Sequence, residues 1–339
     1  IRCRLMLKKL QERGIDVHII TAGIADDPSG ITATMGKLQQ AVAAQTTPGQ
    51  TPPDSIRFDL DGMPYLLIPT HSSNFEEINQ KEQSQLYAYF CHELMTFQPD
   101  LIMGYSGDVF SASLRHEAKS RGIPVVYALC NGSHLTFGFP DCDLVFTTSQ
   151  ATCDFYKKKT GIKVKAVGNF IDSAMVLATP EERKPEYVTM INPSPVKGIA
   201  IFIKLIMAYT ARHPEEQQKF LLVKSRGNFV NIMRSLHFPN GVPLLQSHGQ
   251  IAADTSEQEW EQLILQALPQ LCLAEHTSHI AAVYGLTKTL VAPSVWHESW
   301  GRVATEANIN GIPALVSNSG GLPEAIGIDQ TLDHKQGGG

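Results

Sequence analysis

The sequence of 339 residues lacks the patterns that mark several common classes of protein. Its six cysteines form no C-x-x-C pair and have no metal-ligand spacing, so we expect no metal site. Thiols scattered in this way are typical of a reduced, cytosolic protein. No uninterrupted apolar run approaches the length of a membrane-spanning helix. No G-x-G-x-x-G motif follows a first predicted strand, so a dinucleotide-dependent dehydrogenase is set aside.

An excess of charge of one sign is also lacking. The chain has 28 basic and 33 acidic residues, for a net charge of −5. This balance does not indicate a nucleic acid as the main partner. One basic cluster stands out, Lys157, Lys158 and Lys159 with Lys163 and Lys165, and we interpret it as a solvated helix end rather than a lipid-facing patch.

The length and composition indicate a globular protein of two domains. A hydrophobic content of 43% with 18% charged residues is ordinary, but 339 residues are too many for one core. Short apolar runs alternate with helical patterns along the chain, which is typical of parallel, doubly wound α/β sheets. We assign residues 1–176 to an N-terminal domain, 177–186 to a polar, proline-containing linker, and 187–339 to a C-terminal domain.

The most informative stretch runs from Val291 to Gly327. A predicted strand leads to a turn carrying Glu298, and a helix follows to about Asn310. We expect Ser299 to cap this helix, and Gly301 to leave its first turn open to a ligand. A second strand then leads to a glycine loop containing Gly320 and Gly321, before another predicted helix.

Two helix N-termini within forty residues suggest a phosphate-binding site, because free N–H groups and a partial positive charge gather there. Glu298 and Glu306 are eight residues apart around the first of these ends. Eight helical residues rise about 12 Å, so two such carboxylates suit the two ends of an extended, hydroxyl-bearing ligand. They are less suited to sharing a proton or a metal.

The segment from Glu298 to Glu306, ESWGRVATE, resembles the E-x7-E motif of the retaining GT4 family of glycosyltransferases. The preceding APS and the following GGLPE also resemble that family. The resemblance implies the GT-B fold, in which two Rossmann-like, doubly wound domains face each other across a cleft. It also implies that both ends of the sequence are truncated, since the family's first strand and its closing C-terminal helices are not found here.

The resemblance implies roles for individual residues. Glu298 would contact the transferred sugar and Glu306 the ribose hydroxyls of a nucleotide-sugar donor. Lys197 would pair with the donor diphosphate. Backbone groups around the start of the helix and in the glycine loop would line the same site; these residues are Trp300, Gly301, Arg302, Val303, Gly320 and Gly321.

Two positions depart from the family pattern. Asn192 lies where the family usually has an arginine, and Arg302, Lys224 or Arg226 could supply the missing charge. Cys130 lies where many relatives have a histidine that touches the donor sugar. Two alternatives stay open there: either His134 has taken over this role, or the histidine is absent.

The implied activity is the metal-independent, retaining transfer of a hexose-type sugar from a nucleotide-diphosphate sugar to a glycan or lipid-linked acceptor. The donor is a substrate, and no cofactor is expected. Synthesis of a cell-surface polysaccharide, in the cytoplasm or at the inner face of the membrane, would suit such an enzyme. The alternative is a catalytically silent GT-B module that binds nucleotide sugars. The departures from the family pattern at Asn192 and Cys130 favour this alternative.

Overall fold

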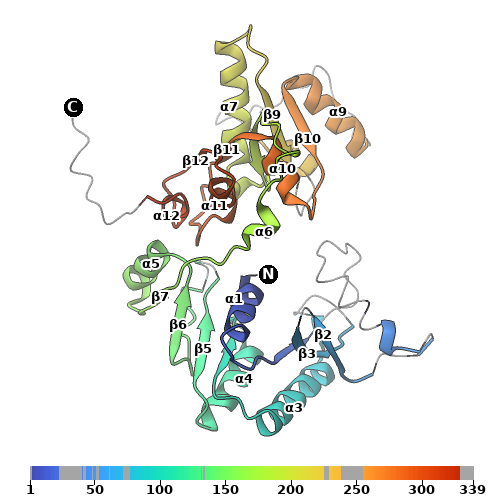
Figure 1. Ribbon diagram of the computed structural model, residues 1–339, viewed down its shortest axis with the longest axis vertical. Coiled ribbons are helices and arrows are strands. Elements are labelled where there is room, and N and C mark those ends of the chain that lie inside the picture. Colours follow the sequence, from blue (N-terminus) through green and yellow to red (C-terminus); the bar gives the residue numbers. More distant parts are fainter. Residues whose placement is uncertain are drawn as a thin grey trace. The chain divides into compact units, whose positions relative to one another are not determined.

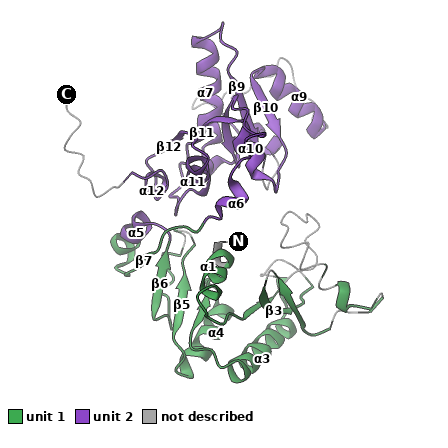
Figure 2. Cartoon of the chain, viewed as in Figure 1, with its two compact units in different colours: residues 1–147, 155–170 green, residues 148–154, 171–339 purple. Residues whose placement is uncertain are grey.

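The computed structural model describes residues 2–22, 40, 43–47, 49–50, 53–60, 62–71, 77–130, 132, 134–224, 229–237 and 255–328 (Figure 1). The chain divides into two compact units, which Figure 2 shows in different colours. The first comprises residues 1–147 and 155–170, and the second comprises residues 148–154 and 171–339. The main part of the second unit therefore begins at residue 171, whereas the N-terminal domain was expected to extend to residue 176. The second unit also includes residues 148–154 from the first half of the chain.

The segment 177–186, expected to be a linker, is bonded to the second unit. The Ala178 N–H donates to Asn310 Oδ1 over 2.8 Å, and the Lys184 N–H donates to the Gly285 carbonyl over 2.8 Å. A Cβ at Gly285 would lie 2.4 Å from the Glu182 carbonyl oxygen, so only glycine permits this approach. The segment is thus a packed part of the second unit.

The first unit contains two sheets. One has the order β1-β3-β2, in which β1 (Ile19–Ala22) and β3 (Met63–Ile68) are parallel and β2 (Ile56–Leu60) is antiparallel to β3. The other is fully parallel, and its strands are β4 (Ile102–Gly104), β5 (Val125–Ala128), β6 (Leu144–Thr147) and β7 (Lys165–Ala166).

A single doubly wound sheet was expected for this unit, and among the described residues it is divided into these two. The two sheets meet through side chains: Ile20 of β1 and Ile102 of β4 pack against one cluster around Phe90 and Val125. Helices complete the unit, namely α1 (Arg2–Gln11), α3 (Gln80–Thr96), α4 (Val109–Ser120) and most of α5 (Gln150–Thr160).

The second unit is built on one parallel sheet with the strand order β10-β9-β8-β11-β12. The strands are β8 (Tyr187–Ile191), β9 (Lys219–Val223), β10 (Leu271–Ala274), β11 (Thr287–Ala292) and β12 (Ala314–Val316). In chain order the sheet reads 3-2-1-4-5, so the direction of winding reverses between β8 and β11. Ligands of open α/β sheets bind at the carboxyl ends of the strands at such a reversal.

Both faces of this sheet are covered, as alternation along β9 shows. Phe220 and Leu222 pack in a cluster with α7 (Ile199–Arg212), α8 (Phe229–Arg234) and α9 (Glu257–Ala267), while Leu221 and Val223 face α10 (Ile280–Leu286). A further cluster around Leu290 joins α10 to α6 (Ser173–Val176), α11 (Arg302–Ile309) and α12 (Leu322–Ala325). Burial of both faces explains the nearly continuous apolar strands.

Candidate functional site

Two loops of the second unit meet where the winding of its sheet reverses. The loop after β8 carries the short 3₁₀ helix Pro195–Lys197, and the loop after β11 carries Glu298. Lys197 Nζ and Glu298 Oε1 form an ion pair across these loops. The Ser294 hydroxyl donates to the same Glu298 oxygen over 2.7 Å. The structure thus brings Lys197 and Glu298 together at the end of the sheet where a ligand is expected.

The backbone of the two loops explains this approach. Gly198 has a φ of +84°, and a Cβ there would lie 2.0 Å from the Pro293 carbonyl oxygen. The N–H of Val295 donates to the Val196 carbonyl over 3.0 Å. Asn192, which also follows β8, has a left-handed φ of +65°, a conformation that asparagine tolerates better than most residues. These loops are therefore fixed to each other before any ligand arrives.

The glycine loop after β12 packs directly on Glu298. A Cβ at Gly320 would lie 2.1 Å from the Glu298 carbonyl oxygen, and the Gly321 N–H donates to that oxygen over 2.7 Å. The two glycines are thus needed for a close backbone approach. One of the N–H groups that the sequence offered as a phosphate ligand is already occupied by Glu298.

Residues 148–154 also contact the loop that carries Glu298 and the helix α12 that follows the glycine loop. The buried Thr148 hydroxyl donates to the Ser299 carbonyl over 2.7 Å. The carboxylate of Glu324, on α12, accepts from the N–H groups of Gln150 and Ala151 over 2.8 and 2.7 Å. No sequence signal indicated these contacts, because Thr148 and Ser299 are 151 positions apart.

Two predictions about the start of α11 were wrong. Its N-cap is Gly301, with a φ of +97° and no side-chain cap hydrogen bond, so Ser299 does not cap the helix. The helix begins two residues later than expected, because the chain first runs through the buried Ser299 to make the left-handed turn at Gly301. The space that a Cβ of Gly301 would take is filled by Leu322 Cδ2, at 2.3 Å, rather than left open to a ligand.

Glu306, on α11, is held by two residues. Arg302 donates to Glu306 Oε1 through Nε over 3.0 Å and Nη2 over 2.6 Å. The Tyr284 hydroxyl, on α10, donates to Glu306 Oε2 over 2.7 Å. Only 5% of the Glu306 side chain is exposed. Sequence reasoning missed Tyr284, and it placed Arg302 near the donor phosphates rather than on Glu306.

The pKa values of two side chains at this site are shifted. Burial, reinforced by the neighbouring Glu306 carboxylate, raises the pKa of the Tyr284 phenol, which therefore stays protonated and remains a donor. Burial lowers the pKa of His297, and the charge of Glu298 opposes that effect.

The other predicted residues of the second unit contact neighbouring side chains within that unit. Trp300 Nε1 donates to the Thr305 hydroxyl over 2.9 Å, and both Trp300 and Val303 pack against the cluster around Leu290. Lys224, one proposed substitute for the family arginine, pairs with Glu261 and Glu275 over 2.5 Å each. Arg226 lies outside the described residues.

The predicted residues of the first unit gather at the carboxyl end of β5. His134 stacks edge-on to Tyr127, with ring centroids 6.5 Å apart, and its Nδ1 would lie 2.9 Å from a Cβ at Gly107. The exposed Cys130 follows the same strand. His134 is thus held among aromatic side chains beside the carboxyl end of β5.

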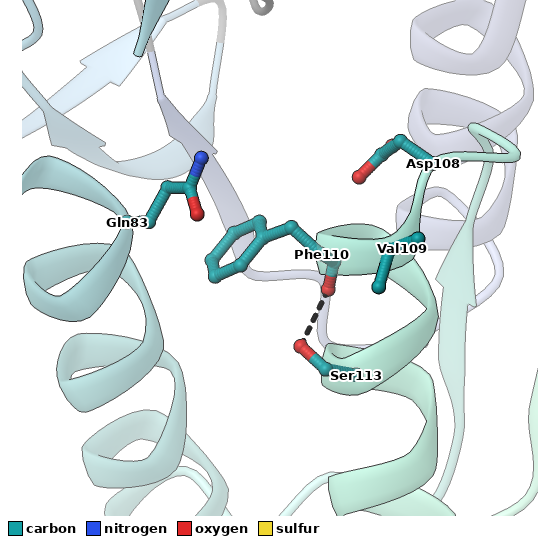
Figure 3. A pocket seen from close by; sticks show the side chains of 5 residues that line it. All are labelled: Gln83, Asp108, Val109, Phe110 and Ser113. Atoms are coloured by element: carbon teal, nitrogen blue, oxygen red, sulfur yellow. Dashed lines mark hydrogen bonds between the residues drawn. The ribbon is translucent and has the colours of Figure 1, made fainter. Parts of the chain in front are cut away.

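Figure 3 shows a pocket in the first unit, between α3 and the start of α4. Its volume is about 390 Å³, and it is lined by Gln83, Asp108, Val109, Phe110 and Ser113. Its polar groups are already engaged: Asp108 accepts from Ser111 N–H and the Ser106 hydroxyl, and Ser113 donates to the Phe110 carbonyl. The pocket therefore offers a ligand mainly apolar surface.

Two kinds of feature are absent from the part of the chain that the structure describes. No group of three or more His, Cys, Asp or Glu side chains is placed to hold a metal ion there. Among the helices within those ranges, none is long and apolar enough to cross a membrane.

The chain is similar to known proteins both in part of its sequence and in its fold. Residues 251–331 match the family model described as Glycosyl transferases group 1. No curated protein matches the sequence. A glycosyltransferase from Rickettsia africae is similar in structure, with a TM-score of 0.61 and 12% identity over 95% of this chain and 76% of that chain.

Two other solved structures are similar. Anabaena HepE, in complex with UDP and glucose, has a TM-score of 0.54 and 18% identity over 78% of this chain and 70% of that chain. Sucrose-phosphate synthase from Thermosynechococcus elongatus has a TM-score of 0.53 and 16% identity over 90% of this chain and 82% of that chain. These similarities confirm the predicted α/β fold with parallel sheets, consistent with the two Rossmann-like domains of GT-B proteins. Together with the family match, they support an enzyme of the transferase class.

Proposed function

We propose that the protein is a retaining glycosyltransferase of the GT4 type. It would transfer a hexose-type sugar from a nucleoside-diphosphate sugar to a glycan or lipid-linked acceptor. The observation that carries this proposal is the ion pair of Lys197 and Glu298 where the winding of the second sheet reverses, with Glu306 on the adjoining helix. Anabaena HepE, whose structure contains UDP and glucose, makes a UDP-sugar the first donor to try.

The residues at this site suit the departure of a diphosphate. In the transfer, the bond from the sugar C1 to the diphosphate oxygen breaks, and a bond from C1 to the acceptor oxygen forms on the same face. The acceptor proton passes to the departing phosphate, so no protein nucleophile is needed. Lys197 would leave its bond to Glu298, or share it, and stabilise the negative charge that develops on the leaving group.

The two glutamates divide the rest of the donor between them. Glu298, 12% exposed at its side chain, would hold hydroxyls of the transferred sugar, while Glu306 would hold the ribose. Backbone groups from Trp300 to Val303 and at Gly320 and Gly321 would line the phosphate path, with Arg226 or Asn192 beside it. His134 of the first unit is proposed to act on the sugar or the acceptor. No metal or other cofactor takes part in the proposed reaction.

We place this chemistry in the synthesis of a cell-surface glycan, in the cytoplasm or at the inner face of the membrane. The scattered cysteines support a reducing compartment. A second candidate function is favoured by Asn192, which lacks the positive charge that the GT4 resemblance leads one to expect. In that case the protein would bind nucleotide sugars without transferring the sugar.

The slow hydrolysis of UDP-glucose in the absence of an acceptor tests the proposal, because it needs no knowledge of the acceptor. Proton NMR distinguishes the two glucose anomers before they equilibrate. We expect α-glucose to form first, and EDTA to leave the rate unchanged. The first appearance of β-glucose would contradict retention, and binding without release of glucose would favour the silent module. ADP- and GDP-glucose extend the test to the other bases.

A further inference from the structure

Tyr284 is a residue of the second unit whose contact with Glu306 the sequence did not anticipate. It is 2% exposed, in a short helix that leads into β11, and its ring packs in the cluster around Leu290. A buried aromatic ring is explained by packing alone. The hydroxyl is not, because it is directed at one oxygen of Glu306 over 2.7 Å.

The carboxylate of Glu306 has few directions left in which to accept a hydrogen bond. A carboxylate offers about four acceptor positions. Arg302 takes two of these on Oε1, and Tyr284 takes one on Oε2. The remaining position is on Oε2, beside the bond from Tyr284. Its direction is therefore set by where the Tyr284 hydroxyl lies.

The two partners of Glu306 differ in how firmly they hold it. The Arg302 side chain is 37% exposed and belongs to the same helix as Glu306, so it can follow a movement of the carboxylate. Tyr284 comes from another helix and is fixed by its packing, so it constrains the carboxylate from outside α11. Binding groups are most effective when such neighbours hold them in one orientation before the ligand arrives.

We propose that Tyr284 is a positioning residue of the donor site: its hydroxyl holds Glu306 in the orientation that accepts a hydrogen bond from the donor ribose. This inference rests on the proposed function, in which Glu306 binds the ribose. Tyr284 itself does not touch the donor. Its loss acts only through Glu306, so it weakens the binding of ligands that have ribose hydroxyls and spares ligands that lack them.

The test compares UDP with 2′,3′-dideoxy-UDP by isothermal titration calorimetry, on the wild type and on Tyr284→Phe. The variant keeps the ring and removes the hydroxyl. Tyr209→Phe is a matched control, because the Tyr209 hydroxyl, in α7, also donates to a glutamate, Glu216, which has no role in the proposed site. ADP and GDP, with their dideoxy analogues, are used if UDP does not bind.

We expect Tyr284→Phe to weaken the binding of UDP about tenfold, as the loss of one well-directed hydrogen bond would. The binding of the dideoxy nucleotide should not change, and Tyr209→Phe should affect neither ligand. Equal losses for both ligands, or no loss, would overturn the proposal and leave Tyr284 a packing residue. If the wild type binds UDP, ADP and GDP no better than unrelated anions, the proposed function fails first.

A double-mutant cycle tests the same inference in a second way. In a Glu306→Ala background, which lacks the acceptor of the Tyr284 hydroxyl, Tyr284→Phe should cause no further loss of UDP affinity, because its effect passes through the carboxylate. Additive losses in the double variant would contradict the proposal.

Discussion

Lys197 and Glu298 form an ion pair although 101 positions separate them in the chain. One follows β8 and the other β11, two strands that are neighbours only because the winding of the sheet reverses between them. The pair therefore depends on the topology of the second unit. It also places an ammonium and a carboxylate where a sugar diphosphate would meet both.

Lys197→Met should lower kcat/KM with a nucleotide sugar by about a hundredfold or more, because a charge on the leaving group loses its partner. The Lys197 side chain is 32% exposed, so the ion pair itself should contribute less than about 1 kcal/mol to stability. Thermal melting then stays close to that of the wild type. Lys288→Met, at an exposed position of β11, is the control and should leave kcat/KM unchanged. Equal activity of both variants would remove Lys197 from the mechanism.

Gly320→Ala should disturb both stability and activity, because its Cβ would overlap the Glu298 carbonyl. Gly311→Ala is a matched control. It has a similar left-handed φ of +71°, but its Cβ would meet nothing within 4 Å. The control should lose about 1–3 kcal/mol of stability through backbone strain alone and keep its kcat. Urea unfolding and turnover, measured on both, separate strain from the clash. A Gly320→Ala variant no worse than the control would contradict the packing of the glycine loop on Glu298.

Thr148→Val removes the hydroxyl that supports the Ser299 carbonyl, next to Glu298. Thr147→Val is the matched control, since its buried hydroxyl makes a similar bond of 2.9 Å to the Leu129 carbonyl, in the first unit. Each substitution should lower the free energy of unfolding by about 1 kcal/mol. Only Thr148→Val should also lower kcat. Loss of kcat in both variants, or in neither, would show that Thr148 does not position the loop of Glu298.

The lowered pKa of His297 predicts a pH-dependent stability. The unfolded chain binds a proton at this side chain below about pH 6.5, where the folded protein still excludes it. The contribution of His297 is therefore present above about pH 6.5 and is lost as the pH falls toward its lowered pKa. His297→Gln should melt with a smaller change between pH 7.5 and 5.5 than the wild type. His237→Gln is the control and should melt with the same pH dependence as the wild type. The same pH dependence in His297→Gln would contradict the prediction.

The C-terminal half of the fold could be predicted from local patterns. Its strands are nearly continuous apolar runs, and the stretch around Glu298 and Glu306 combines glycines, carboxylates and helix boundaries at short spacing. The start of α11 was misplaced because Ser299 resembles an N-cap locally, whereas the N-cap is Gly301, where the contact with Leu322 leaves no room for a Cβ. Tyr284 and Thr148 could not be found, since no local pattern links either to a partner 22 or 151 positions away.

The division of the first unit's strands into two sheets could not be predicted from the sequence either. Pattern alone indicates strands and their length, but not which strands pair. Ile20 and Ile102 are both apolar residues of short strands, and nothing in either segment indicates that they pack against one shared cluster while their strands belong to different sheets.

We propose above that the second unit binds a nucleotide sugar through Glu306. Thermal melting of the wild type and of Glu306→Ala against UDP-, GDP- and ADP-sugars tests it most directly. A ligand at a hundred times its dissociation constant stabilises the folded protein by about 2.7 kcal/mol, which is readily seen as a shift in Tm. We expect a shift with one nucleotide series that is lost in Glu306→Ala. No shift with any series, or an equal shift in the variant, would contradict it.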